Sequence, residues 1–374
     1  MKIAFYSPLK APTSWVPSGD LRMANTLIKA LESAGHCVKL ASEFRSREPL
    51  GDPTRQKVLR FEGHKAAEDL INKYALQEHF PDLWFTYHVY YKAPDWIGPL
   101  VAKELNIPYV IAEASHAPKR AGGPWNMNHQ CVENSIKEAD LVVGLNSLDA
   151  GCVKPLLHEN TKYLQLKPFI DLPSEKLTRK GDKRSTFARD MNLNTDHIWF
   201  LTVAMMRKGA KHKSYELLAK SLDLIKKSGW QLLVAGDGPV RSVVEALFDG
   251  LPTTFVGQQD QPTISNLMTI SDVFLWPAIE EAYGMAMLEA QGHGLPVIAG
   301  NTGGVGDIIR DGVTGTLTKV GDVAAFSNAI RQLMDAPETL AKMGLQAQSI
   351  VKQDHSISGA AQQLDTALTG LIND

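Results

Sequence analysis

The sequence predicts an α/β protein made of two doubly wound domains, each built on a parallel sheet. The chain has 374 residues, more than one hydrophobic core usually serves. Short apolar runs alternate with helical patterns along most of it, an order typical of parallel sheets with crossover helices. A polar stretch at 168–184, which contains two prolines, divides this alternation, and we place the interdomain linker near its start.

The first half contains five short apolar runs that predict the strands of one sheet. They lie at 2–7, 37–42, 83–87, 108–112 and 141–146. Helical spacing of apolar residues separates several of them, as between Asp20 and Ser33. We therefore expect residues 1–170 to form one Rossmann-like domain.

The second half repeats the alternation. Its predicted strands lie at 198–204, 231–236, 253–257, 273–277 and 296–300. We expect residues 171–355 to form the second Rossmann-like domain. The last segment, about 356–374, has a helical pattern, and we expect it to pack back on the first domain.

Composition limits the classes of function. Hydrophobic residues make up 44% and charged residues 21%, and the net charge of -2 gives no field that would attract nucleic acid. Residues 1–170 carry 20 basic and 18 acidic side chains, a small bias towards an anionic membrane surface. The three cysteines form no C-x-x-C pair, which favours a reducing compartment over a disulfide framework or a structural zinc site. The N-terminus lacks the long apolar region of a signal peptide, and no apolar run reaches about 18 residues. We expect a cytoplasmic protein whose membrane contact, if any, is peripheral on the inner face.

The stretch from Trp276 to Gly315 is the richest in chemistry. A buried strand ends at Pro277, and a helix is expected to open near Tyr283. The free N–H groups of a first helical turn suit a diphosphate or a sugar hydroxyl. Glu281 precedes that turn and Glu289 lies inside the helix, so two carboxylates can accept hydrogen bonds from two sugars of one ligand. A lone glutamate at a helix start is more often a cap, but the pair with its flanking glycines favours a ligand site.

These residues resemble a known family. The two glutamates stand in EAYGMAMLEA, and the landmarks around them are AGDGP (235–239), FVG (255–257), SDVFLWP (271–277), GLPVIA (294–299), TGGVGDII (302–309) and DGVTG (311–315). Together they resemble the retaining glycosyltransferases of GT-B fold, the large family 4 or "glycosyl transferases group 1", in which two glutamates are separated by seven residues. The resemblance covers most of the C-terminal half and is looser in the N-terminal half. It implies two Rossmann-like domains that face across a cleft holding the active site.

The resemblance assigns roles to the donor-side residues. Glu289 would bind the ribose hydroxyls of the nucleotide, and Glu281 would contact the donor sugar. The remaining donor-side candidates are the backbone amides of Ala282, Tyr283, Gly284 and Met285, together with Gly257 and Gly19. Gly19 stands where the family often has glycine for close approach to phosphate. The alternative interpretation is that Gly19 simply permits a turn.

The family also has a basic pair early in the second domain, an arginine and a lysine five residues later, that neutralises the donor diphosphate. This chain departs from that pattern in MMRKGAKHK (205–213), because aligning Lys211 on the lysine puts Met206 at the arginine position. We expect Arg207 and Lys211 to serve, with Lys208 and Lys213 as rivals for the same role. The other reading is a cluster of solvated surface charges.

Two histidines follow predicted strands of the first domain, where open parallel sheets bind ligands. His116 matches a family position close to the donor sugar, and we expect it to be catalytic. His88 is an acceptor-side candidate, as are Lys119 and Arg120. For either histidine, a structural hydrogen-bonding role is the alternative.

The resemblance implies transfer with retention, without a metal or other cofactor. The acceptor hydroxyl would attack as the diphosphate departs. The expected partners are a nucleotide sugar, with UDP favoured over GDP on family frequency, and an acceptor lipid, glycan or small molecule. A glycolipid or envelope polysaccharide is the acceptor that the faint basic bias favours.

Three rival interpretations remain. An NAD-dependent oxidoreductase would need G-x-G-x-x-G after the first strand, and SPLKAPTSWVPSG does not supply it. A UDP-sugar epimerase of similar fold is disfavoured by the glutamate pair. A catalytically inactive nucleotide-sugar-binding protein is disfavoured by the same pair, although the altered basic motif leaves it open.

Overall fold

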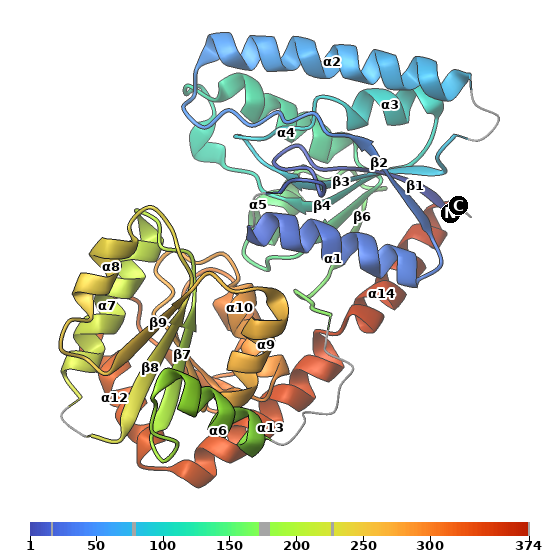
Figure 1. Ribbon diagram of the computed structural model, residues 1–374. Helices are drawn as coiled ribbons and strands as arrows, with labels where there is room; N and C mark the ends of the chain where they lie inside the picture. Colours follow the sequence, from blue (N-terminus) through green and yellow to red (C-terminus); the bar gives the residue numbers. More distant parts are fainter. Residues whose placement is uncertain (16–17, 77–79, 172–179, 226–227, 373–374) are drawn as a thin grey trace. The chain divides into compact units, whose positions relative to one another are not determined.

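The computed structural model describes residues 1–15, 18–76, 80–171, 180–225 and 228–372, and it divides into two compact units (Figure 1). Unit 1 comprises Met1–Lys167 and Ile357–Asp374, and unit 2 comprises Pro168–Ser356. Residues 172–179, within the stretch where the linker is expected, lie outside the described residues, as do 373–374 of the expected C-terminal helix.

Unit 1 is built on a six-stranded, entirely parallel sheet in the order β2-β1-β3-β4-β5-β6. Its strands are β1 (Lys2–Tyr6), β2 (Cys37–Ser42), β3 (Leu83–Val89), β4 (Tyr109–Ala114), β5 (Leu141–Gly144) and β6 (Lys162–Gln165). The central strands are buried on both faces, which is why they read as continuous apolar runs in the sequence.

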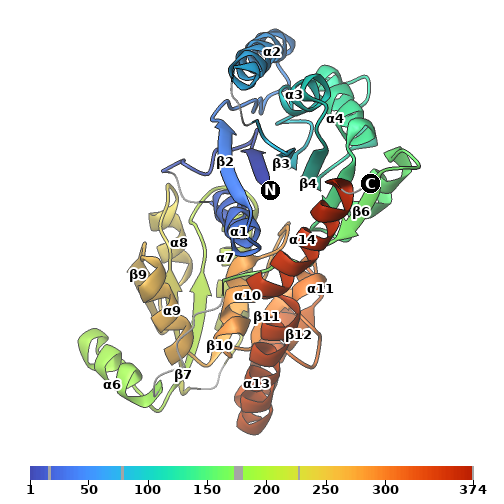
Figure 2. The same cartoon turned by 90° about the vertical axis from the view of Figure 1, so that its right-hand side faces the viewer.

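Helices cover both faces of this sheet. They are α1 (Gly19–Ser33), α2 (Pro53–Ala75), α3 (Gly98–Leu105), α4 (Asn126–Glu138), α5 (Ala150–Val153) and α14 (Ile357–Ile372), with short 3₁₀ turns η1 (Pro118–Arg120) and η2 (Lys154–Leu156). Helices α2, α3 and α4 lie on one face, and α1 lies with α14 on the other (Figures 1 and 2). The chain therefore returns from unit 2 to complete unit 1 with its last helix.

Unit 2 repeats the architecture with a second parallel six-stranded sheet, in the order β12-β11-β10-β7-β8-β9. Its strands are β7 (Ile198–Val203), β8 (Trp230–Ala235), β9 (Thr253–Gly257), β10 (Val273–Trp276), β11 (Val297–Gly300) and β12 (Gly315–Thr318). Every residue of β8, β10 and β11 is buried, as expected for strands covered on both faces.

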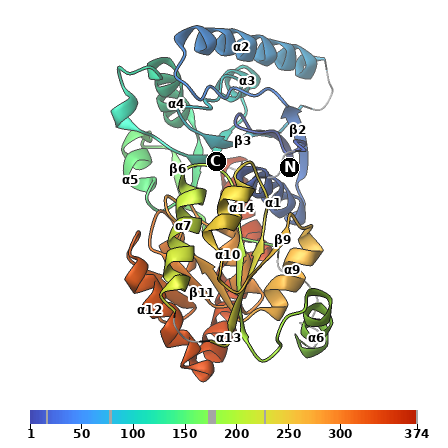
Figure 3. The same ribbon diagram turned by 60° about the vertical axis from the view of Figure 1, so that its left-hand side comes forward.

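The helices of unit 2 also form two layers. They are α6 (Lys180–Met191), α7 (Ala210–Asp223), α8 (Arg241–Leu247), α9 (Gln261–Ile270), α10 (Met285–Gly292), α11 (Val305–Ile308), α12 (Val323–Met334) and α13 (Pro337–Asp354). Helices α7, α8 and α12 pack together on one face, and α9 and α10 lie on the other (Figures 1 and 3). Asp260 caps α9 by accepting a hydrogen bond from Thr263 N–H at 3.0 Å.

Each sheet has one point at which the order of its strands reverses. In unit 1, β2 lies on one side of β1 and β3 on the other; in unit 2, β8 lies on one side of β7 and β10 on the other. Loops that leave the carboxyl ends of such strands form a crevice where α/β proteins bind ligands. The two reversal points, β1/β3 and β7/β10, are called switch points below.

Within the described ranges, no helix combines the length and the apolar character needed to cross a bilayer.

Candidate functional site

The switch point of unit 2 brings together a carboxylate, a cation and an aromatic ring. Glu281 lies in the loop after β10, and its carboxylate forms an ion pair with the ammonium of Lys211 at the start of α7. Trp276, the last residue of β10, donates its indole N–H to the same carboxylate at 3.1 Å. The Lys211 Nζ also lies 5.0 Å from the centre of the Trp276 ring. The two loops of this switch point are therefore tied to each other by charged side chains.

The backbone around Glu281 is fixed by glycines. Gly284 adopts a left-handed conformation, φ 75°, and α10 begins after it at Met285, two residues beyond the Tyr283 start that the sequence predicts. Gly303 lies against the same loop with φ 53°, and a Cβ there would be 2.0 Å from the carbonyl oxygen of Glu281. Gly304 N–H donates to Ala282 C=O at 2.6 Å. The motifs around 281–285 and 302–306 thus form one packed backbone unit.

Glu289 lies on α10 and differs from Glu281 in its surroundings. Glu289 is buried, whereas Glu281 is partly exposed. Carboxylates are rarely buried unless they are paired or bind a ligand. A carboxylate buried next to the first turn of α10 is suited to accept hydrogen bonds from the hydroxyl groups of a ligand.

The basic residues separate into two groups. Met206, at the expected arginine position, is fully buried in the core of unit 2. Arg207, Lys208 and Lys213 are exposed. Lys211 is half-buried and is the basic residue that the structure joins to Glu281.

Gly257 lies apart from this cluster. It ends β9, and β7 and β8 separate that strand from β10. Its backbone is left-handed, φ 73°, and a Cβ there would be 3.5 Å from the guanidinium of Arg241. The structure does not join Gly257 to Glu281.

The switch point of unit 1 gathers acidic groups around one histidine. His88 Nδ1 lies 3.1 Å from an Asp20 oxygen, and Asp20 lies in the first turn of α1. Glu113 stands on β4 next to His88 because the pairing of β3 and β4 matches Val89 with Ala114. The ends of β3 and β4 and the first turn of α1 thus place a cation and two carboxylates at one edge of the sheet.

Electrostatics keep His88 protonated. Burial lowers the pKa of the His88 imidazole, but Glu113, Asp20 and Asp149 outweigh it and raise this pKa to about 9. Burial raises the pKa of Glu113, opposed by the charge of His88. A protonated histidine among carboxylates offers both donors and acceptors to a polyhydroxy ligand.

The backbone at this site is unusual too. His88 and Glu113 both have left-handed conformations, with φ of 65° and 61°. Non-glycine residues rarely adopt them, and such conformations collect at functional sites. Ser115 Oγ donates to Asp149 at 3.1 Å in the same region.

Gly19 begins α1, whose N-cap is Ser18. The Ser18 oxygen accepts hydrogen bonds from Leu21 N–H at 3.2 Å and from Lys10 Nζ at 3.0 Å. A Cβ at Gly19 would meet no described residue within 4 Å, so none of the described residues requires glycine there. Among the described residues, the space beside Gly19 is therefore open to the approach of a ligand phosphate.

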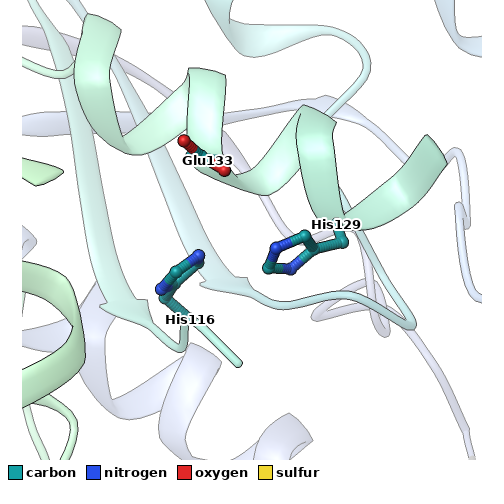
Figure 4. Close-up of side chains that lie close together, drawn as sticks. All are labelled: His116, His129 and Glu133. Carbon is teal, nitrogen blue, oxygen red and sulfur yellow. The ribbon is translucent and has the colours of Figure 1, made fainter. Parts of the chain in front are cut away.

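The remaining unit 1 candidates lie beyond β4. The His116 ring stacks on His129 of α4 at 4.9 Å between centroids (Figure 4). The Arg120 guanidinium lies 4.8 Å from the centre of the Tyr91 ring and 4.9 Å from that of Trp125. Lys119 is exposed. His116 and Arg120 thus contact aromatic rings, whereas His88 pairs with Asp20.

Sequence reasoning missed several members of these clusters. Trp276 was interpreted only as a strand residue, and Asp20, Glu113 and Asp149 were not singled out. Each lies at or just beyond the carboxyl end of a strand, or in the first turn after it. A position at the carboxyl edge of a sheet is the signal that would have found them.

Comparison with known proteins shows which family and which relatives the chain is similar to. Residues 189–350 match the family described as "Glycosyl transferases group 1". The sulfoquinovosyl transferase SQD2 of Arabidopsis thaliana is 37% identical over 130 residues, which are 34% of this chain and 25% of that protein. An N-acetyl-alpha-D-glucosaminyl L-malate synthase of Bacillus anthracis is 23% identical over 294 residues, 77% of this chain and 75% of that protein. The match thus spans only a quarter of the first relative's length.

Among solved structures, HepE of Anabaena in complex with UDP and glucose has 17% sequence identity to this chain and a TM-score of 0.70. The similarity covers 99% of this chain and 100% of HepE, and at this identity it concerns the fold. Both sheets of the two units are therefore those of a known architecture. We conclude that the chain has the GT-B fold and that its residues 189–350 match the family of glycosyl transferases group 1.

Proposed function

We propose that the chain transfers a sugar from a nucleotide-sugar donor, a UDP-sugar in the first instance, to an acceptor hydroxyl with retention of anomeric configuration. The observation that carries this proposal is the cluster of Lys211, Glu281 and Trp276 at the switch point of unit 2, inside the matched family region. A cation and a carboxylate side by side suit a ligand that carries both a diphosphate and sugar hydroxyls. The UDP and glucose in the HepE complex support UDP as the nucleotide.

Four side chains of unit 2 would have distinct tasks in holding the donor. Lys211 exchanges its ion pair with Glu281 for the β-phosphate, and Arg207 adds a second positive charge. Glu281, released from Lys211, accepts hydrogen bonds from the sugar, next to the amides of 282–285. Glu289 binds the ribose. This exchange links arrival of the diphosphate to exposure of the sugar-binding carboxylate.

The chemical step needs charge stabilisation rather than a protein nucleophile. The acceptor oxygen forms a bond to the anomeric carbon as the bond from that carbon to the β-phosphate oxygen breaks. The acceptor proton passes to the departing diphosphate, so the products are a glycoside and UDP. Lys211 and Arg207 stabilise the negative charge that grows on the leaving group.

We assign the acceptor to unit 1. Asp20, Glu113 and Asp149 offer acceptors for hydroxyl groups, and protonated His88 offers a donor. We propose His116 as a catalytic residue of unit 1, as the resemblance implies. This chemistry fits a sugar or polyol hydroxyl, whether free or as the headgroup of a glycolipid.

The proposal is tested with the full chain in two steps. Calorimetric titration with UDP, GDP and ADP identifies the nucleotide, and we expect UDP to bind tightest. The chain is then incubated with UDP-glucose, UDP-galactose or UDP-N-acetylglucosamine and crude lipid or sugar acceptors, and products are identified by mass spectrometry. We expect release of UDP together with a product one sugar heavier than the acceptor.

A matched pair of variants ties binding to the site. Glu289→Gln keeps the shape of a buried side chain and should weaken UDP binding, with the preference for UDP over 2′-deoxy-UDP lost. Glu280→Gln changes an exposed carboxylate nine residues earlier and should bind UDP like the parent chain. A chain that binds UDP-sugars without releasing UDP is an inactive binding protein, and one that returns an epimerised donor is an epimerase.

A further inference from the structure

Three side chains beyond the carboxyl end of β4 converge on one space, away from the clusters described above. His116 follows β4, and His129 and Glu133 stand four residues apart on α4. Residues four apart lie on the same side of a helix, so both side chains face the segment after β4. Figure 4 shows His116 directed towards α4 and the other two side chains directed towards His116.

The distances among these groups are close to those of a metal site. One ligand atom from each residue can be chosen so that all lie within 4.8 Å of one another. His129 is 3% exposed, and His116 and Glu133 are half-buried. Bonds of about 2.0–2.2 Å from a metal to imidazole nitrogen and carboxylate oxygen need a closer approach, which side-chain rotation can supply. The backbone already places the three groups around a common centre.

We propose that His116, His129 and Glu133 form a binding site for a divalent transition-metal ion, and that this ion is Zn²⁺. Two imidazoles and one carboxylate are the donor set of zinc and of non-haem iron sites, whereas Mg²⁺ and Ca²⁺ prefer oxygen donors alone. With three protein ligands the metal keeps a coordination position for water. The ion would join the segment after β4 to α4.

One neighbouring charge opposes the metal. Lys137 lies one turn beyond Glu133 on α4, and its ammonium is 2.7 Å from a Glu133 oxygen. Both partners are partly exposed, and an exposed pair of this kind contributes little to stability. The metal can therefore displace Lys137 from the carboxylate, although the lysine lowers the affinity by competition and by like-charge repulsion.

Occupation of this site has a consequence that rests on the proposed function. His116 is the residue of unit 1 proposed to be catalytic, and an imidazole bound to Zn²⁺ cannot take part in the reaction. The metal is therefore expected to inhibit transfer and not to assist the diphosphate. This distinguishes it from the metal ions that some transferases use at the phosphates.

The site is tested by binding, which requires no activity. The full chain is freed of metal with a chelator and titrated with Zn²⁺ by calorimetry and with Co²⁺ by visible absorption. We expect one equivalent to bind, with Co²⁺ bands of a nitrogen- and oxygen-ligated ion. Glu133→Gln and His129→Asn should each weaken binding at least tenfold, while His158→Gln, at an exposed histidine of unit 1, should not change it.

Lys137→Gln separates a metal site from an accidental group of histidines. It removes the competing ammonium and should tighten Zn²⁺ binding, whereas no structural role of Lys137 predicts a gain. If Glu133→Gln and Lys137→Gln both leave the affinity unchanged, or if no equivalent binds, the proposal is wrong. If Zn²⁺ binds as expected but UDP release by Glu133→Gln is as sensitive to Zn²⁺ as that of the parent chain, the site stands and its inhibitory role falls.

Discussion

The two units have the same sheet topology at their switch points but opposite chemistry there. In unit 2, Lys211 at the start of α7 and exposed Arg207 and Lys208 after β7 carry three positive charges, against the carboxylates of Glu280 and Glu281 after β10. In unit 1 the strand ends carry one histidine among carboxylates, with His88 held protonated by them. The edge of the sheet at the switch point is therefore cationic in unit 2 and acidic in unit 1.

The two edges also differ in how they are held. In unit 2, the Glu281 loop is fixed by backbone contact, since Gly303 and Gly304 lie directly on the carbonyls of Glu281 and Ala282. In unit 1, left-handed residues are held by side-chain contacts such as His88 to Asp20. A cationic edge suits a ligand of fixed chemistry such as a diphosphate, and an acidic edge suits a variable set of hydroxyls. The difference supports the assignment of donor to unit 2 and acceptor to unit 1.

The largest effect is expected from removing the cation of unit 2. Lys211→Met takes away positive charge at the leaving group, and we expect the rate of UDP release to fall about 100- to 1,000-fold. The loss should appear in kcat and in the KM for the donor, with the KM for the acceptor unchanged. Steady-state kinetics with varied donor and acceptor measure all three.

Lys220→Met is the control for that variant, because Lys220 is an exposed lysine on the same helix, α7. Its kinetics should match those of the parent chain. A Lys211→Met enzyme that changed only the KM for the acceptor would reverse the assignment of the two units.

The next effect is a dependence of stability on pH that belongs to unit 1. The folded-state pKa of His88, about 9, lies above the ordinary value of 6.5. Its stabilising contribution is therefore fully present below pH 6.5 and is lost as the pH rises through 9. His88→Asn keeps a side chain that tolerates the left-handed backbone and should cost up to about 3 kcal/mol at pH 6.

The measurement is urea unfolding of both proteins from pH 6 to pH 10. The difference in the free energy of unfolding between parent chain and variant should shrink across that range. The reason is that the parent loses the contribution of protonated His88, which the variant lacks at every pH. A difference that stayed constant with pH would mean that folding does not shift the pKa of His88 and that its role is steric.

Much of the fold follows from the sequence because buried parallel strands leave a plain signal. Strands such as β3 and β8 are mostly apolar, and they lie within two residues of where the sequence predicts them. Helix α2 gave no comparable signal, since its buried positions include Gln56, Gly63 and Ala67, which are polar or small. A helix whose core face lacks large apolar residues has little hydrophobic periodicity to detect.

The candidate site could be predicted only in part, for a different reason. Glu281 and Lys211 are predicted because each lies in a motif that resembles one of the family. The structure joins their side chains, although 70 positions separate them. Glu113 and Asp20 gave no motif, because each acquires its partner from another element through the sheet register. Met206 at the expected arginine position is explained by burial, since the core of unit 2 excludes a guanidinium there.

The smallest effect is expected from the backbone contact that fixes the Glu281 loop. Gly303→Ala places a methyl group 2.0 Å from the Glu281 carbonyl oxygen, so the loop or the 302–304 segment must shift. Gly321→Ala is the matched control, because Gly321 is also left-handed, φ 82°, but a Cβ there meets nothing within 4 Å. Both variants share the cost of a left-handed alanine, and the difference between them reports the clash.

We expect Gly303→Ala to be less stable than Gly321→Ala by about 2 kcal/mol, the usual cost of overpacking a well-packed site. Its KM for the donor should rise because Glu281 moves with its backbone, while Gly321→Ala should bind the donor normally. Urea unfolding and UDP calorimetry on the two variants measure both effects. Equal stabilities would show that the loop yields without cost, and the rigid backbone would then no longer distinguish the cationic edge from the acidic one.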